Sequence, residues 1–315
     1  MAIGGYFELE LPVVKEYHQN AIKLNTGRNA FEYILRAKTY KKVYLPYYIC
    51  GTLFEPIAKL KLDHEFYHIN DTFMPVFNFS KIKSNEVFLY INYFGICNSQ
   101  VKEVSGKCKN IVVDNSQAFY TNAQDNVDTF YSPRKFFGVP DGAYLYTNIE
   151  LNQELQHDVS YERMQHLLGR IEFGAEEYYT KFKTNNELLS GQPIKKMSNL
   201  THRLLESINY VDASRKRRKN FIYLHENLRK TNQLHIDIDS EAVPMVYPFL
   251  INNGSQLKDE LINRKIFVAT YWPNVLLLAP KGSFEYNVAY NLIPLPIDQR
   301  YSKNDMRQIL KYLNV

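Results

Sequence analysis

The sequence predicts an α/β fold built on a mainly parallel sheet. Short apolar runs of strand length alternate with stretches of helical periodicity along most of the chain, which is the pattern of parallel α/β proteins. The runs at residues 87–91 and 111–113 are almost continuously apolar, as expected of strands buried on both faces. A chain of 315 residues can bury a substantial core, as one α/β unit or as a large domain with a smaller one.

In the first half of the chain the expected elements follow in a regular order. A turn at residues 25–27 leads into an amphipathic helix over 30–37, and a strand over 43–45 then ends at Pro46. The next segments are a helix over 52–60 and strands over 65–69, 87–91, 111–113 and 143–147.

The second half is expected to be mostly helical from residue 151 to 231, with a polar interruption at 185–198. The last part of the chain predicts a strand over 245–251, a helix over 255–264, a strand over 266–270 and a helix over 303–313 capped by Ser302. The composition does not mark a domain boundary, and we place it near residue 215. The prediction is therefore a large domain over 1–215 and a small carboxyl-terminal domain over 216–315.

The composition is that of an ordinary soluble globular protein, with 45% hydrophobic and 23% charged residues. No apolar run approaches the roughly 18–20 residues that a membrane span needs, so no membrane partner is expected. The segment 1–14 lacks the basic and apolar regions of a secretory signal. Three cysteines are too few and too scattered for a disulfide framework or a zinc site. These features predict a cytoplasmic protein without a metal.

The charge pattern is mild, with a formal net charge of +5 and one dense basic run at 215–219. That run lies in a segment of helical periodicity, which favours a solvated helix face over a nucleic-acid-binding patch. No nucleic-acid partner is expected. The 25 tyrosines would suit an interface or a pocket for a sugar or nucleotide, but genomic composition explains such a count as well.

The segment from Asp114 to the Pro-Asp-Gly turn at 140–142 carries the most chemistry. Asp114 follows the buried strand at 111–113, and Lys135 lies just before that turn. A pyridoxal phosphate (PLP) enzyme needs an Asp that keeps the pyridine nitrogen protonated and a Lys that forms the Schiff base and moves protons. Taken singly, however, an Asp after a strand is more often a helix cap, and a Lys in a turn is more often solvated.

Two other segments contain candidate ligand-binding residues. The segment 25–31, NTGRNAF, leads straight into a helix, whose free N–H groups would form an anion site to which Arg28 adds charge. An ordinary capped glycine loop explains the same residues. Tyr47 and Tyr48 follow the strand at 43–45, at the sheet edge where α/β ligands bind, and would either stack on a flat ring or pack in the core.

Taken together, these segments resemble the PLP-dependent sugar aminotransferases of the DegT/StrS type. The family's phosphate loop, NSGTAAL, is similar to residues 25–31, and its Asp-x-x-His/Gln ring motif is similar to 114–117. Its lysine followed by a Gly-Glu-Gly-Gly turn resembles Lys135 and residues 140–143. The resemblance extends to further segments and so covers nearly the whole chain: Lys196-Met197-Ser198, the pair Arg217-Arg218 followed by Tyr223, and IPLPIDQRYSKNDM near the carboxyl end.

The resemblance implies a fold-type-I PLP-transferase. Its large domain would contain a mainly parallel, mixed seven-stranded sheet flanked by helices, and its small carboxyl-terminal domain would be α+β. The implied reaction moves an amino group from an amino acid, such as glutamate, to a keto group of a nucleotide-linked sugar, in surface glycan or polysaccharide biosynthesis. The implied assembly is a homodimer with active sites at the subunit interface. A non-catalytic or divergent protein of this fold, and an aminotransferase for a small ketone, remain alternatives.

The resemblance also implies roles for individual residues. Lys135 would form the Schiff base, Asp114 would face the pyridine nitrogen, and Gln117 would lie by the 3-hydroxyl side of the ring. The other cofactor contacts would come from Gly27, Arg28, Tyr48 and Ser132, and contacts with the substrate or the partner subunit from Tyr47, Tyr93, Lys196 and Arg300.

Three features depart from the family pattern. The chain is shorter than usual members, and Arg28 stands where a small hydroxyl residue is common. The segment Ile194-Lys195-Lys196 stands where the family has Asn-x-Arg. The related sugar dehydratases have a histidine in place of the lysine, so Lys135 argues against that branch.

Overall fold

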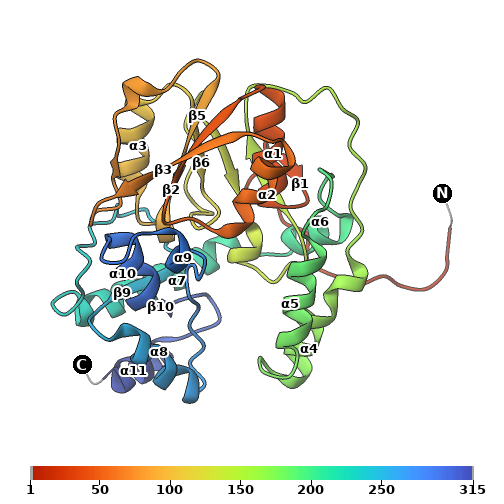
Figure 1. The fold of residues 1–315 in the computed structure, drawn as a ribbon. Coiled ribbons are helices and arrows are strands. Elements are labelled where there is room, and N and C mark those ends of the chain that lie inside the picture. Colours follow the sequence, from red (N-terminus) through yellow and green to blue (C-terminus); the bar gives the residue numbers. More distant parts are fainter. Residues whose placement is uncertain (1–2, 314–315) are drawn as a thin grey trace.

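The computed structural model describes residues 3–313 and contains a large sheet flanked by helices and a smaller body around a second sheet (Figure 1). The large sheet has eight strands in the order β1-β8-β7-β6-β5-β2-β3-β4. Their bounds are β1 Ile22–Leu24, β2 Lys42–Pro46, β3 Asp63–Ile69, β4 Pro75–Val76, β5 Glu86–Ile91, β6 Ile111–Asp114, β7 Asp128–Tyr131 and β8 Ala143–Tyr146.

The sheet is mixed but mainly parallel. Strands β3, β2, β5, β6 and β7 pair in parallel, whereas β8 is antiparallel to both β7 and β1, and β4 is antiparallel to β3. The α/β class is therefore confirmed, with one strand more than the seven expected. All residues of β5 and β6 are buried, which explains why their apolar runs were visible in the sequence. The short strands β1 and β4, and β7 with its polar start, gave no such signal.

Helices cover the sheet and build the smaller body. The predicted helices at 30–37, 52–60, 255–264 and 303–313 are all present within a few residues. The observed bounds are α1 Gly27–Ala37, α2 Phe54–Lys59, α3 Asn98–Lys107, α4 Gln165–Phe173, α5 Tyr179–Leu188, α6 Asn199–Leu205, α7 Tyr210–Leu228, α8 Gly254–Asn263, α9 Val275–Leu278, α10 Phe284–Asn291 and α11 Lys303–Tyr312. Short 3-10 turns lie at η1 Gly51–Leu53, η2 Phe79–Lys81, η3 Tyr93–Gly95, η4 Pro133–Lys135 and η5 Tyr161–Met164.

The smaller body lies at the lower left of Figure 1, around the antiparallel pair β9 Val246–Leu250 and β10 Leu292–Pro296. Helix α7 packs against β9 and α11, and α8 packs against β10. The strand expected over 266–270 does not form. These residues pair with neither strand of the small sheet, in which β9 and β10 bond only to each other. The proposed boundary at residue 215 falls within α7, and the division into two domains stays a prediction.

Eleven of the 25 tyrosines are buried inside the fold. Tyr48, Tyr90, Tyr93, Tyr131 and Tyr144 are among the largest side chains that are fully buried. Such residues fill the core with a large ring while their hydroxyl groups need a partner. Between residues 3 and 313 there is also no helix with the length and apolarity that a membrane crossing requires.

Candidate active site

The predicted catalytic residues gather where parallel strands of the large sheet end. Asp114 is the last residue of β6, and Lys135 is the last residue of the turn η4 that follows β7. Because β6 and β7 are parallel, their carboxyl ends lie at the same edge of the sheet. Gly27, the first residue of α1, also faces this edge, since a Cβ added to it would lie 3.5 Å from Ser116 Oγ.

Asp114 is a buried carboxylate with no ion-pair partner among residues 3–313. The residue is 6% exposed. Its Oδ1 accepts a hydrogen bond of 2.8 Å from the backbone N–H of Ser116. Burial raises the pKa of Asp114 to about 6, although Ser116 and the charge of Lys135 oppose this shift. No cation forms an ion pair with it in the described part of the chain. A cationic group placed beside Asp114 would favour its ionised form.

Lys135 is positioned by the backbone of its turn. Its N–H donates to the carbonyl oxygen of Ser132 at 3.2 Å, while its side chain is exposed at the edge of the site. Ser132 itself is buried. The charge of Lys135 opposes the rise in the pKa of Asp114, and both residues lie at the carboxyl edge of strands β6 and β7.

Two neutral hydrogen-bond donors on side chains that adjoin Phe94 are buried without a hydrogen-bond partner in residues 3–313. Gln117 Oε1 accepts from the backbone N–H of Phe94 at 2.7 Å, which leaves Gln117 Nε2 unpaired. The hydroxyl group of Tyr48 is unpaired as well, and its ring lies 6.5 Å from that of Phe94. Buried polar groups are nearly always hydrogen-bonded. A flat, cationic ring with polar substituents would supply what these groups lack: acceptors for the two donors and a positive charge beside Asp114.

The backbone around Phe94 is closely packed against the Gln117 segment. Phe94 and Gly95 have positive φ angles of 56° and 73°, which glycine adopts without strain. A Cβ added to Gly95 would lie 2.8 Å from the carbonyl oxygen of Gln117. Gly95 therefore permits the close approach that brings the Phe94 N–H to the Gln117 side chain.

Helix α1 begins at Gly27, within the segment predicted to bind an anion, but Arg28 is already paired. Thr26 caps the helix by accepting a hydrogen bond of 3.2 Å from the N–H of Asn29, and the first-turn N–H groups have no partner inside the helix. Arg28 pairs with Glu55 and donates to Ser190 Oγ at 3.2 Å. Its charge is thereby offset before any ligand binds.

Arg134 is an additional cation that sequence reasoning missed. It directly precedes Lys135, and its Nη2 donates to Asn186 Oδ1 at 2.6 Å. Burial lowers the pKa of Arg134 to about 10, and its Nε has no hydrogen-bond partner within residues 3–313. Its position beside the candidate lysine was the available signal.

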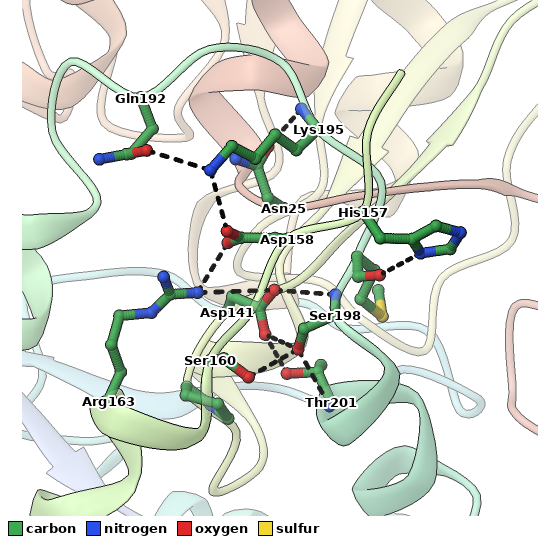
Figure 2. A network of polar contacts seen from close by, with 12 residues as sticks. Asn25, Asp141, His157, Asp158, Ser160, Arg163, Gln192, Lys195, Ser198 and Thr201 are labelled. Atoms are coloured by element: carbon green, nitrogen blue, oxygen red, sulfur yellow. Dashed lines mark hydrogen bonds and ion pairs between the residues drawn. The ribbon is translucent and has the colours of Figure 1, made fainter. Parts of the chain in front are cut away.

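A polar network fixes the far end of the lysine turn (Figure 2). Asp141 is fully buried and accepts hydrogen bonds from Thr201 Oγ1 and from Ser198, whose Oγ lies at 2.8 Å and backbone N at 3.1 Å. Burial raises the pKa of Asp141, while these hydrogen bonds oppose the shift. The N–H of Gly142 donates to the carbonyl oxygen of Asn25 at 2.6 Å. The turn is thus tied both to α6 and to the residue that precedes the α1 cap.

A second buried carboxylate in Figure 2 holds the segment that departs from the family pattern. Asp158 pairs with Arg163 Nη2 at 2.6 Å and with Lys195 Nζ at 3.3 Å. Lys196 has an exposed side chain, and its backbone N–H donates to Gln156 at 2.8 Å. Ile194 is buried. In residues 3–313, no side chain of the segment 194–196 forms a hydrogen bond or ion pair with another predicted site residue.

The remaining predicted contacts are not gathered around Asp114. Tyr47 stacks on Phe66 at 5.0 Å, above strand β3. Tyr93 is fully buried and donates its hydroxyl group to the carbonyl oxygen of Tyr48 at 3.0 Å, so it has no free face for a substrate. Arg300 is held by both oxygens of Asp298, at 2.7 and 2.9 Å.

The prediction of a fully solvated basic face at 215–219 is wrong for its central residue. Arg217 is 2% exposed and lies among core residues, whereas Arg215 and Lys216 are exposed. Asn220 and Phe221, on the same side of α7, are buried as well. Helical spacing places Arg217 on that side.

Comparison with known proteins places the fold. No family model matches the sequence, and no curated protein matches it. A DegT/DnrJ/EryC1/StrS aminotransferase from Brucella abortus is 15% identical, with a TM-score of 0.61, over 93% of this chain and 85% of that one. The aminotransferase TlmJ from Streptoalloteichus hindustanus is 13% identical, with a TM-score of 0.66, over 93% of this chain and 84% of that one. The chain has the DegT/DnrJ/EryC1/StrS aminotransferase fold.

A third similar structure was solved in its PLP form. Spr1654 from Streptococcus pneumoniae, assigned as a sugar aminotransferase and solved in its PLP form, is 14% identical, with a TM-score of 0.65. The alignment covers 92% of this chain and 85% of that one. The fold resemblance that the motifs implied is therefore confirmed over nearly the whole chain.

Proposed function

We propose that this protein is a PLP-dependent aminotransferase with a sugar substrate. The observation that carries the proposal is the buried, uncompensated carboxylate of Asp114 at the end of β6, in one site with Lys135. When bound, PLP supplies an electron sink next to the carbon that bears the nitrogen. The DegT/StrS fold and the sugar aminotransferases among its neighbours support this assignment.

Each candidate residue has a physical task in this proposal. Asp114 would keep the proton on the ring nitrogen, and Lys135 Nζ would hold the cofactor covalently and carry a proton. Gln117 Nε2 and the Tyr48 hydroxyl group, both unpaired within residues 3–313, would donate to polar substituents of the ring. The first-turn N–H groups of α1 at Gly27 and Arg28 would hold the phosphate.

For the substrates, we propose an amino acid such as glutamate as donor and a nucleotide-linked keto sugar as acceptor. The pathway would be surface glycan or polysaccharide synthesis in the cytoplasm. The sequence resemblance to DegT/StrS enzymes supports these choices. A divergent, non-catalytic protein is the second candidate, because the Arg28–Glu55 ion pair already neutralises one charge of the proposed phosphate cradle.

We further propose that two copies associate. Figure 1 shows the amino-terminal segment extending away from the body, on the side where α4 and α5 project. The amino-terminal segment and the α4–α5 hairpin both expose large apolar side chains. Monomeric proteins rarely expose large contiguous apolar areas. The exposed residues of this arm and hairpin surface are Tyr6, Phe7, Leu9, Leu168, Ile171, Phe173 and Tyr179.

The test is to mix the purified chain with PLP, reduce the mixture with borohydride and locate the modified peptide by mass spectrometry. The proposal expects modification at Lys135, followed by amine transfer from an amino acid to a keto compound. Lys135→Ala should remain unmodified, whereas Lys102→Ala, which removes an exposed lysine of α3, should behave as the natural chain. A chain that binds PLP but transfers no amine to any keto compound would support the non-catalytic alternative.

A further inference from the structure

The most unusual charged residue outside the proposed catalytic set is Arg217 on α7. Its residue is 2% exposed, and it is among the largest side chains fully enclosed by the fold. It forms no ion pair with any carboxylate of residues 3–313. Burying a guanidinium group without a carboxylate to balance its charge is costly. Burial lowers the pKa of Arg217 to about 10. Such a group needs a structural reason.

The hydrogen bonds of Arg217 all lead toward the candidate site. Its Nη2 donates to the carbonyl oxygen of Phe136 at 3.2 Å, and its guanidinium carbon lies 4.5 Å from the centre of the Phe136 ring. Phe136 directly follows Lys135. Its carbonyl oxygen also accepts from Gln299 Nε2 at 2.9 Å, and Gln299 Oε1 accepts from Arg217 Nε at 2.8 Å. Arg217 and Gln299 thus hold one carbonyl group together.

The same guanidinium group also reaches toward Gln117. Arg217 Nη1 donates to the carbonyl oxygen of Met245 at 3.0 Å, and the N–H of Met245 donates to the carbonyl oxygen of Phe94 at 2.8 Å. Phe94 in turn donates to the Gln117 side chain at 2.7 Å. A single side chain of α7 therefore connects the lysine turn with the segment that orients Gln117.

The planar guanidinium group suits this task better than an ammonium group would. It presents donors in a fixed fork and stacks flat on an aromatic ring. A lysine in its place would offer one compact, strongly hydrated charge that cannot meet the carbonyl groups of Phe136 and Met245 and the amide of Gln299 in one geometry. The Phe136 carbonyl group belongs to the peptide unit that follows Phe136. Arg217 contacts both this carbonyl group and the Phe136 ring, so it holds the residue to which Lys135 is directly bonded.

We propose that Arg217, with Gln299, is a positioning residue that fixes the Phe136 carbonyl group and so aims Lys135 into the site. The inference rests on the proposed function, because the task of Lys135 is defined there. It adds a specific role for the smaller body, which supplies both side chains to the lysine turn.

The experiment compares Arg217→Lys, Arg217→Met and Gln299→Leu with Arg215→Met, a matched loss of an exposed charge on the same helix. For each we would measure thermal stability, the rate at which Lys135 becomes covalently linked to PLP, and the pH midpoint of the visible absorbance of that linkage. We expect all three test variants to slow the linkage by about tenfold to a hundredfold and to shift the midpoint, with Arg215→Met unchanged. Folded variants with the natural rate and midpoint would overturn the inference.

A second readout separates this inference from the proposed function. In the cofactor-free chain, reductive methylation of Lys135 is followed by peptide mass spectrometry, with Lys102 as the internal reference. We expect the ratio of the two rates to change in Arg217→Lys and Gln299→Leu but not in Arg215→Met, even if the natural chain never links to PLP. An unchanged ratio in both folded test variants would overturn the positioning role, whereas failure of the natural chain to bind PLP would overturn the proposed function.

Discussion

Gly142 and Asn25 are joined by a backbone hydrogen bond of 2.6 Å between the Gly142 N–H and the Asn25 carbonyl oxygen. This contact ties the end of the lysine turn to the loop that begins α1. The proposed covalent site and the proposed phosphate cradle are therefore parts of one connected backbone unit. A change at either end would alter the distance between them.

Lys135→Ala should abolish covalent attachment of PLP while leaving the fold intact. The side chain is exposed at the edge of the site, so its removal creates no cavity in the core. Borohydride reduction and peptide mass spectrometry provide the readout, and circular dichroism the control for folding. An active variant still linked to PLP would mean that another lysine is the nucleophile.

Asp114→Asn should bind PLP but turn over much more slowly. The substitution keeps the shape of the side chain and its hydrogen bond from Ser116, but removes the charge that keeps the ring nitrogen protonated. We expect a loss on the order of 10²-fold or more in rate. Steady-state and single-turnover rates with the same amino donor would measure it. A rate close to that of the natural chain would refute the role of Asp114.

Ionisation of Asp114 should cost the cofactor-free chain stability as the pH rises from about 4 to 6. The folded-state pKa of Asp114 is raised from 3.8 to about 6 by burial, so the folded state binds a proton more tightly than the unfolded state does. The resulting stabilisation is fully present below the unfolded pKa and is lost as the pH approaches the folded one, by roughly 2–3 kcal/mol.

Urea unfolding at several pH values, with Asp114→Asn as the reference, would measure this effect. The Asn variant has no proton to lose, so its slope in this pH range should be smaller. Bound PLP should also flatten the slope by supplying the missing cation. Equal slopes for the natural chain and the variant would contradict the assignment of the raised pKa.

The chain should be a dimer whose interface includes the arm and hairpin surface. Ile171→Glu on α4 would place a charge among apolar groups and should shift the assembly toward monomers, because an unpaired charge is costly to bury. Light scattering over a range of concentrations measures the mass, with Lys102→Glu as a control outside the surface. A natural chain that is monomeric, loaded with PLP and active would exclude the dimer.

The acceptor should be a nucleotide-linked keto sugar rather than a 2-oxo acid. Arg28 at the candidate site is already paired with Glu55, and Arg134 alone, with its Nε unpaired within residues 3–313, would not form the arginine fork that grips a small carboxylate. The enzyme loaded with amine from glutamate would be mixed with 3- and 4-keto nucleotide sugars and with simple 2-oxo acids. Rapid turnover of the acids alone would leave an aminotransferase with a different substrate.

The sequence predicted those parts of the fold that have a local cause. The buried strands β5 and β6 were predicted from their apolar runs. Asp114 and Lys135 were predicted from their order along the chain. The apolar run at 266–270 did not become a strand, because pairing depends on which strand lies beside it. Arg217 was expected in solvent, because a run of basic residues does not reveal which member turns inward. Tyr93 has the right position for a ligand contact, but neighbouring rings enclose it.

The carbonyl group of Phe136 is held by two side chains from the last third of the sequence. These contacts limit where the chain can be divided. A fragment ending at residue 215 would contain Asp114, Lys135 and the whole large sheet, yet it would lack Arg217 and Gln299. Such a fragment would keep the contacts of the lysine turn with Ser198, Thr201 and Asn25, but its Phe136 carbonyl group would lose both side chains that hold it. We expect efficient attachment of PLP to Lys135 to return only when the carboxyl-terminal fragment, supplied separately, binds again next to Phe136.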